Sequence, residues 1–264
     1  MPQILKDKIV SVETLADGIV KMVIHSPYTV EHAKPGQFVN IKCQDGLDAL
    51  LRRPISICEL DKTAQTVTIV FQVKGKGTKI LAEKKPGDEL DMIAPLGWGV
   101  FNLEQRNKKV AIVGGGIGVF PLYELAKQLK GVTASTTTIL GFRNKDLVVM
   151  EPEFTDVSSN LLVATDDGSY GIKGFTTNLL EQEIQENGVD QIFACGPMPM
   201  LKRVAAIAER YNVSCQVSLE ERMGCGIGAC LVCACKTKHG DEWEHSHVCY
   251  NGPIFDSKEV VFDD

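Results

Sequence analysis

Four cysteines near the carboxyl end of the chain have the spacing of iron–sulfur ligands. Cys225, Cys230 and Cys233 form a Cys-x4-Cys-x2-Cys run, and Cys249 follows after a gap of fifteen residues. Three thiolates on one short loop can wrap a cluster, and a fourth thiolate from a later segment can complete its ligand shell. The spacing is therefore typical of plant-type 2Fe-2S ligation.

Glycines alternate with these cysteines and support the same interpretation. Gly224, Gly226 and Gly228 let the backbone pass close to the sulfurs, so that its N–H groups can point at an anionic cluster. The alternative is a zinc site with four thiolates, although structural zinc usually favours paired Cys-x2-Cys knuckles. Cys235 breaks the ligand spacing, and we expect it to be a packed or spare thiol.

A second chemical motif is the glycine-rich loop Gly114-Gly115-Gly116-Ile117-Gly118. It follows the apolar stretch 109–113 and precedes a helical pattern over 121–130. A strand, a glycine turn and a helix in this order can cradle a pyrophosphate on free N–H groups. The third glycine of the G-x-G-x-x-G fingerprint falls on Val119 or Pro121, so the loop by itself could also be a tight turn.

Three shorter stretches could also bind anions or a flavin. Arg52-Arg53-Pro54-Ile55-Ser56 offers a guanidinium for a diphosphate and a hydroxyl for a flavin ring, unless Arg53 is a solvated surface charge. The turn 74–78 precedes a helical pattern, although a simple hairpin loop would explain it equally well. Residues 195–200 follow a predicted strand at its carboxyl end, where open α/β sheets bind ligands, while Cys195 alone could be a small buried hydrophobe.

Two kinds of secondary structure must position these motifs. Six β-branched, partly alternating runs in the first hundred residues predict an antiparallel six-stranded barrel, at 8–14, 18–25, 36–43, 54–60, 66–73 and 88–94, with one helical interruption at 78–85. Strand runs at 109–113, 136–142, 161–165, 191–195 and 215–219, with helices at 121–130, 175–184 and 199–210, predict an open, mostly parallel sheet. The remainder predicts a small, loop-rich, Cys-rich unit.

The resulting fold class is multi-domain β plus α/β. We expect domains at 1–103, 104–218 and 219–264, which suits a chain of 264 residues. The net charge of -6 gives no support for a nucleic-acid or anionic-membrane partner. No apolar run is long enough to span a bilayer, and the charged amino terminus has no secretory pattern. An odd number of unevenly spaced cysteines argues against a disulfide scaffold, so we expect a cytoplasmic protein.

The order of the motifs resembles the ferredoxin-reductase family. That family carries an RPxS flavin motif, a GxGT turn, a GGGIG nicotinamide loop and a CGPxxM segment in this order, and all four are present. The stretches LEERMGCGIGACLVC, GPIFDSKEVVF and TDDGSYGIKGFTT narrow the resemblance to the electron-transfer subunits of dihydroorotate dehydrogenase B. The resemblance covers essentially the whole chain. One departure is Trp98, where a smaller or polar residue would be expected.

The resemblance implies an FAD barrel, an NAD-binding α/β domain and a 2Fe-2S domain. In the family the RPxS residues contact FAD, here Arg53, Pro54, Ile55 and Ser56, and the flavin site is completed by Val70, Phe71, Gln72, Gly77 and Thr78. The nicotinamide cofactor would be held by Gly114, Gly115, Gly116, Gly118, Cys195, Gly196 and Pro197. Cys225, Cys230, Cys233 and Cys249 would ligate the cluster, and no acid–base catalytic residue is implied.

The resemblance also implies a partner. In the family a catalytic subunit containing FMN oxidises dihydroorotate to orotate, and electrons then pass through the cluster and FAD to NAD+, in pyrimidine (UMP) biosynthesis. FAD is the converter because a nicotinamide transfers two electrons, a 2Fe-2S cluster takes one, and a flavin can do both. We expect a heterotetramer of two plus two subunits, with the cluster domain at the interface.

Two other interpretations stay open. A sulfide dehydrogenase or an NADH-dependent ferredoxin:NADP oxidoreductase uses a similar subunit, although some of those relatives replace one cluster cysteine by aspartate, and this chain has four. A zinc-binding or redox-sensing module that has kept the fold is the other. Arg143 and Lys145, beside Asp146, stand where an NADP site places basic groups, and NADH is expected by resemblance alone.

Overall fold

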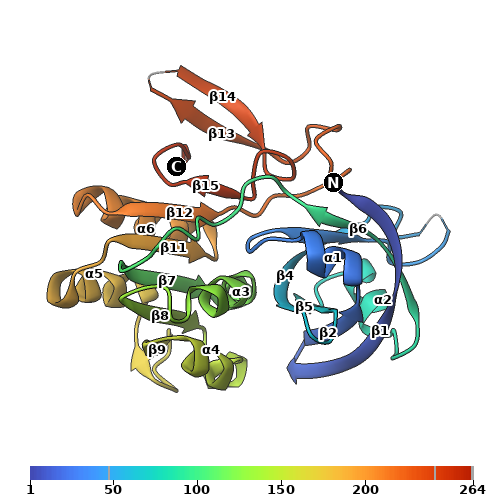
Figure 1. Cartoon of the computed structure of the whole chain (residues 1–264), viewed down its shortest axis with the longest axis horizontal. Helices are drawn as coiled ribbons and strands as arrows, with labels where there is room; N and C mark the ends of the chain where they lie inside the picture. Colours follow the sequence, from blue (N-terminus) through green and yellow to red (C-terminus); the bar gives the residue numbers. More distant parts are fainter. Residues whose placement is uncertain (47, 241, 263–264) are drawn as a thin grey trace.

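The first hundred residues form the predicted barrel. The computed structural model describes residues 1–46, 48–240 and 242–262. Its closed antiparallel barrel has the strand order β1-β2-β5-β4-β3-β6 (Figure 1). Pairing of β6 with β1 leaves no free strand edge. The strands are β1 (Gln3–Ala16), β2 (Ile19–His25), β3 (Phe38–Ile41), β4 (Arg53–Asp61), β5 (Thr66–Gln72) and β6 (Glu89–Leu96).

Two short helices interrupt the barrel. The helix predicted at 78–85 is α2 (Lys76–Ala82), which starts earlier because the Thr78 hydroxyl accepts the backbone N–H groups of Lys74 and Gly75 at 3.0 and 3.1 Å. The helix α1 (Pro27–His32) was not predicted, because six residues are too few to show a helical period.

The middle of the chain forms the predicted parallel sheet. Its strand order is β10-β9-β8-β7-β11-β12-β15, and every neighbouring pair is parallel except β12 with β15. The strands are β7 (Lys109–Gly115), β8 (Ser135–Phe142), β9 (Asn160–Thr165), β10 (Ile172–Lys173), β11 (Gln191–Cys195), β12 (Ser214–Ser218) and β15 (Ile254–Asp256).

Helices cover both faces of this sheet. Alternate residues of β7 belong to different cores: Val110 and Ile112 pack with α3 (Phe120–Leu129) and α4 (Glu151–Val157), whereas Ala111 and Val113 pack with α5 (Thr176–Asn187) and α6 (Met198–Arg210). Two 3-10 turns, η1 (Gly116–Val119) and η2 (Lys145–Leu147), follow β7 and β8. The helix α4 was not predicted.

The carboxyl-terminal segment contains more regular structure than the sequence indicated. A hairpin of β13 (Ala234–His239) and β14 (Glu242–His247) lies where a loop-rich unit was predicted, and β15 joins the edge of the parallel sheet. The hairpin was missed because β14 buries only Ser246 and therefore shows no apolar alternation. The boundary at residue 219 stays a prediction, and residues 263 and 264 of that unit lie outside the described residues.

The three parts meet at one core. Phe38 and Leu96 of the barrel belong to the same hydrophobic cluster as Cys233, Val248 and Cys249 and the α5–α6 face of the sheet. In Figure 1 the carboxyl-terminal segment, in orange and red, lies across the top of the barrel and the sheet. Strand β3 is therefore positioned to connect the barrel with the cysteine-rich loop.

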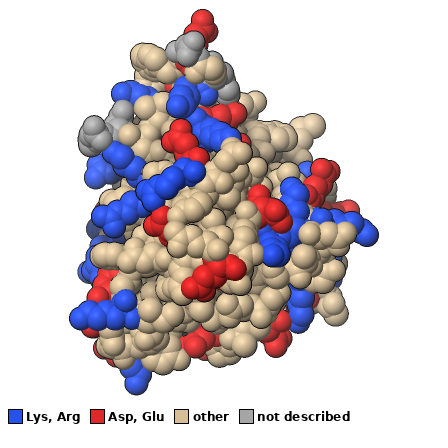
Figure 2. All heavy atoms as spheres, turned by 90° about the vertical axis from the view of Figure 1, so that its left-hand side faces the viewer, with Lys and Arg blue, Asp and Glu red and all other residues tan. Residues whose placement is uncertain are grey.

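Side chains of both charges are mixed on one face of the molecule, as the modest net charge of -6 suggests. Figure 2 shows basic and acidic side chains interspersed over that face. Among the helices that the structure describes, none has the length and apolar character that crossing a bilayer requires.

Candidate functional site

The predicted cluster ligands come together on one loop and on the segment after β14. Backbone N–H groups of the loop point at the sulfurs: Ile227 and Ala229 donate to Cys225 Sγ at 3.4 and 3.2 Å, and Gly228 donates to Cys249 Sγ at 3.2 Å. Such donors stabilise negative charge on sulfur. The loop is therefore preorganised for thiolates.

The four thiols form two close pairs. Cys225 interacts with Cys230, and Cys233 interacts with Cys249. Burial raises the pKa of the Cys225 thiol. Hydrogen bonds from the backbone N–H groups of Ile227, Ala229 and Cys230, and one with the Cys230 side chain, outweigh burial and lower the pKa to about 6. Burial, together with the Cys233 sulfur, raises the pKa of Cys249 to about 12.

This pairing fits a two-iron cluster better than one zinc ion. A 2Fe-2S cluster places two protein ligands on each iron. Cys235 lies on β13, where burial raises its pKa to about 11, which suits the packed thiol expected there.

The glycines of the loop are required by close packing. Gly226 and Gly228 have φ of +74° and +86°, which L side chains rarely adopt. A Cβ on Gly226 would lie 2.4 Å from Asn40 Nδ2, and a Cβ on Gly228 would lie 3.0 Å from the Tyr250 side chain. The loop therefore touches the barrel on one side and the segment after Cys249 on the other.

The flavin motifs RPxS and GxGT meet at the start of β4. A Cβ on Gly77 would lie 2.6 Å from Arg53 Nε, so the guanidinium lies directly against the start of α2 and would have to move if Gly77 were replaced. Arg53 Nη1 donates to the Leu51 carbonyl at 2.6 Å, and Thr78 caps the turn. A fixed guanidinium beside the open end of a short helix can bind a diphosphate.

The remaining predicted flavin residues divide between the barrel and its neighbours. Phe71 is buried in the barrel core, and Val70 packs against the sheet domain; neither is among the lining residues of the two cavities described below. Gln72, at the end of β5, does line one. Pro54, Ile55 and Ser56 continue β4 and are half-buried opposite β3, with Ser56 paired to Phe38.

The glycine loop opens into a cavity of about 740 Å³ between the barrel and the sheet domain. Gly116, with φ of +56°, has open space where a Cβ would be, whereas a Cβ on Gly114 would meet Val119 at 2.9 Å. Open backbone at the end of β7 suits the approach of a pyrophosphate. The predicted residues that line this cavity are Gln72, Gly115, Gly116, Gly118, Gly196 and Pro197.

The CGP segment interlocks with the glycine loop. A Cβ on Gly118 would lie 2.5 Å from the Cys195 carbonyl oxygen, and a Cβ on Gly196 would lie 2.6 Å from the Met200 side chain. Cys195 itself is buried, and burial raises its pKa, as does the nearby Glu220 carboxylate. Its thiol is thus a neutral packed group, while its backbone shapes the cavity floor.

Sequence reasoning missed several charged residues of this cavity. Glu220, directly after β12, is enclosed by protein atoms yet open to solvent through the cavity; burial raises its pKa, and Lys74 partly offsets this. Asp166 lines the cavity from the end of β9. Arg143, one of the two basic residues considered for an NADP site, also lines it, whereas Lys145 and Asp146 are not among its lining residues. The position of each residue at the carboxyl end of a strand was the available signal.

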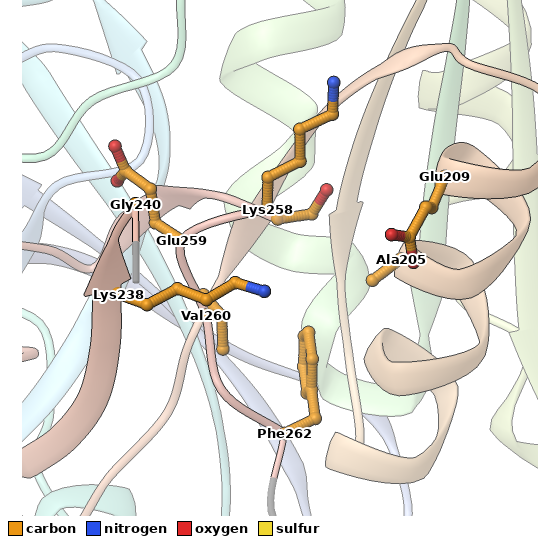
Figure 3. Close-up of a pocket in the computed structure, with 9 residues that line it drawn as sticks. Ala205, Glu209, Lys238, Gly240, Lys258, Glu259, Val260 and Phe262 are labelled. Carbon is orange, nitrogen blue, oxygen red and sulfur yellow. The ribbon is translucent and has the colours of Figure 1, made fainter. Parts of the chain in front are cut away.

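A second cavity of about 590 Å³ lies between α6, β13 and the carboxyl-terminal segment (Figure 3). It is lined by side chains of both charges, including Lys238, Lys258 and Glu209. No predicted site residue lies there.

Apolar side chains surround the exposed side of the cysteine loop. Trp98 packs edge-on against Tyr250 with ring centroids 6.4 Å apart, and its backbone N–H donates to the Tyr250 carbonyl at 3.1 Å. Trp98 therefore supports the surface beside the loop. Together with Tyr250, Ile227, Leu231 and Val232 it forms a group of side chains that are each at least half exposed, the apolar rim.

The chain is similar to known proteins over its full length. Residues 220–261 match the model of the iron–sulfur cluster binding domain of dihydroorotate dehydrogenase B. The chain is 38% identical, over 100% of both chains, to the dihydroorotate dehydrogenase B (NAD(+)) electron transfer subunit of Desulforamulus reducens. It is 44% identical to the subunit of that name from Fusobacterium nucleatum, over 93% of this chain and 94% of the relative.

Solved structures share the fold. An NADH-dependent reduced ferredoxin-NADP oxidoreductase structure matches with a TM-score of 0.84 and 34% identity, over 97% of this chain and 90% of the other. A Neisseria gonorrhoeae ferredoxin NADP+ reductase with bound FAD and NADP matches with a TM-score of 0.66 at 14% identity, over 83% and 94% of the two chains, which shows the fold alone. Because it is 38% identical to the Desulforamulus reducens subunit over the whole chain and 44% identical to the Fusobacterium nucleatum subunit, the protein belongs to the family of dihydroorotate dehydrogenase B electron-transfer subunits.

Proposed function

We propose that this chain carries electrons from the FMN of a dihydroorotate-oxidising catalytic subunit, through a 2Fe-2S cluster and FAD, to NAD+, in pyrimidine (UMP) biosynthesis. Its relatives are named electron transfer subunits of dihydroorotate dehydrogenase B (NAD(+)), which supports the electron-carrying role. When bound, the flavin exchanges two electrons with the nicotinamide and single electrons with the cluster.

The observation that carries the proposal is that the barrel contacts both the cysteine loop and the cavity at the glycine loop. Strand β3 touches the cysteine loop through Asn40 and pairs with β4, which begins with the flavin motif. Ile19 and Gln72, at the ends of β2 and β5, line the cavity into which the glycine loop opens. A flavin held at the start of β4 would thus lie between a cluster and a nicotinamide.

Each group has a role that follows from its surroundings. Arg53, Gly77 and Thr78 would hold the FAD diphosphate, with Pro54, Ile55, Ser56, Val70, Phe71 and Gln72 forming the rest of its site. Gly114, Gly115, Gly116 and Gly118, with Cys195, Gly196 and Pro197, would hold NAD(H). Cys225, Cys230, Cys233 and Cys249 would ligate the cluster, whose charge the loop N–H groups stabilise.

The apolar rim supports docking of the catalytic partner at the cluster. Leu231 and Val232, between two cluster cysteines, are 63% and 56% exposed, an unusual cost for apolar side chains unless a partner covers them. An electron donor docked there would lie beside the cluster. We propose a complex of two catalytic and two electron-transfer subunits, a cytoplasmic location because the NAD(H) pool is intracellular, and domains at 1–103, 104–218 and 219–264.

The test is to purify the chain anaerobically from its native cells with whatever it binds, and to add dihydroorotate and NAD+. We expect NADH and orotate to form together and both to stop when the partner is removed. A preparation that oxidises NADH with an artificial acceptor but forms no orotate would refute the proposed partner.

A second candidate has one observation in its favour. The 34% identity to an NADH-dependent reduced ferredoxin-NADP oxidoreductase covers 97% of this chain, so a ferredoxin-linked partner would use the same cofactor chain. Reduced ferredoxin should then replace dihydroorotate as the electron donor in the same assay. Activity with dihydroorotate alone would exclude this candidate.

A further inference from the structure

Asn40 is a buried polar residue at the contact between barrel and cysteine loop. Its neighbours Val39 and Ile41 are fully buried in the barrel core, so strand alternation turns the Asn40 side chain outward. It is nevertheless only 1% exposed, because the loop at Cys225 and Gly226 covers it. An amide in this position must interact with the loop.

The contact fixes the first cysteine of the cluster motif. Asn40 Nδ2 donates to the Cys225 carbonyl oxygen at 3.2 Å. Directly after this carbonyl the chain turns through Gly226, and the next N–H groups, of Ile227 and Ala229, point at Cys225 Sγ. Holding the carbonyl in place therefore orients the donors that face the sulfur.

The backbone of Asn40 is held in turn by Arg52. Arg52 Nη1 donates to the carbonyl oxygens of Asp91 and Asn40 at 2.9 and 3.4 Å, and Nη2 forms an ion pair with Asp91 Oδ1 at 2.6 Å. Arg52 directly precedes the flavin motif. Arg52 thus connects the start of β4 with β3 and β6, at the end of the barrel that carries Asn40.

The side-chain carbonyl oxygen of Asn40 indicates that the residue is not there to stabilise the fold. Asn40 Oδ1 is buried and has no hydrogen-bond partner among the described residues. A buried acceptor without a partner is unfavourable, and an apolar side chain of the same shape would avoid that cost. Asn40 is thus better explained by the one bond that it makes to the cysteine loop.

We propose that Asn40 is a positioning residue for electron transfer: it holds the Cys225 end of the cluster against the barrel strand that neighbours the flavin motif. The proposal rests on the proposed function in one respect, that Cys225 ligates the cluster. Asn40 acts through the Cys225 backbone and keeps the flavin and cluster sites in a fixed contact.

The experiment compares Asn40→Leu with a matched control, Gln105→Met, in the holo-protein. Gln105 is also fully buried, donates through Nε2 to a backbone carbonyl, that of Asn102 at 3.0 Å, and has an unpartnered Oε1, but it lies in the segment between barrel and sheet. Both substitutions remove the same kind of bond. Only one of them touches the cysteine loop.

We expect Asn40→Leu to release iron to a chelator about fivefold faster than the unchanged chain, the size of one lost hydrogen bond. Its reduced cluster should show an altered electron paramagnetic resonance signal, and its thermal midpoint should match that of Gln105→Met. Asn40→Asp, which keeps the volume but turns a carboxylate toward the Cys225 carbonyl, should release iron faster still.

Equal iron release in Asn40→Leu, Gln105→Met and the unchanged chain would overturn the proposal. Loss of FAD together with iron would also overturn it, because that result indicates a general role in the barrel. Cys225→Ala, which leaves no donor atom for iron, is run in parallel: a cluster that survives this change overturns the ligand assignment itself, whereas its loss leaves the iron-release comparison as the test of Asn40 alone.

Discussion

Replacing Glu124 by alanine is expected to weaken the contact between the barrel and the sheet domain. Glu124, on α3, is 3% exposed, and its Oε2 accepts the backbone N–H of Leu60 on β4 at 2.9 Å. Lys127, one turn further, donates to Glu59 Oε1 and to the Leu60 carbonyl, both at 2.9 Å. Because α3 follows the glycine loop and β4 begins with the RPxS motif, these bonds hold together the two elements that we propose bind NAD(H) and FAD.

The magnitude follows from what the alanine leaves behind. The Leu60 N–H, in a residue that is 4% exposed, loses its acceptor, which costs about 1–3 kcal/mol. Lys127 keeps its two other partners, so an unpaired-charge penalty adds little. We expect Glu124→Ala to lower the free energy of unfolding by about 2 kcal/mol, or the thermal midpoint by roughly 4–8 °C. Glu124→Gln keeps a carbonyl acceptor and should lose less than half of this.

Thermal unfolding of the FAD-loaded chain measures the effect. The matched control is Glu186→Ala on α5: Glu186 accepts from Gln182 at 2.9 Å, as Glu124 accepts from Gln128 at 2.6 Å, but it is exposed and touches no barrel residue in a described hydrogen bond. This control should unfold like the unchanged chain. If Glu124→Gln destabilised as much as Glu124→Ala, the bond to Leu60 could not be the cause.

Three further predictions concern the cofactor sites. Cys225→Ala should abolish the visible absorption of the cluster while Cys235→Ala keeps it, as spectra of anaerobically purified protein would show; equal loss would contradict the ligand set. Gly118→Ala should raise the KM for NADH at least tenfold, because its Cβ would lie 2.5 Å from the Cys195 carbonyl oxygen and must displace the loop; an unchanged KM in steady-state assays would count against the cavity as the nicotinamide site. Burial raises the pKa of Glu220 above its ordinary value near 4.5, so its contribution to stability is full below that value and is lost as pH rises through the raised pKa. Glu220→Gln should remove this part of the pH dependence of chemical unfolding, and an unchanged pH profile would refute a raised pKa at Glu220.

The sequence predicted the parts whose chemistry restricts residue choice. The barrel strands followed from alternation, because one face of each strand is buried, and α3, α5 and α6 followed from apolar positions at helical spacing. The set of four candidate cysteines was chosen from spacing, since a cluster restricts how far apart its ligands can lie, whereas their division into two pairs is visible only in the structure.

Other features left no local trace. The helices α1 and α4 are one to two turns long, too short for a period. Strand β14 has polar residues on both faces, so nothing alternates. Asn40 acquires its surroundings from a loop far away in sequence, and no motif marks it.

Strand β15 changes the entropy of assembling the cluster. Ser218 and Ile254 are directly paired, so backbone hydrogen bonds of the sheet close the segment between them into a loop. Cys225 and Cys249 both lie near the base of that loop, and the cost of bringing chain segments together rises with the length of free chain between them. Pairing of β12 with β15 supplies most of the entropy cost of bringing these two segments together. Metal insertion therefore completes a nearly closed ring of chain, and loss of the cluster should leave both ends of the segment anchored.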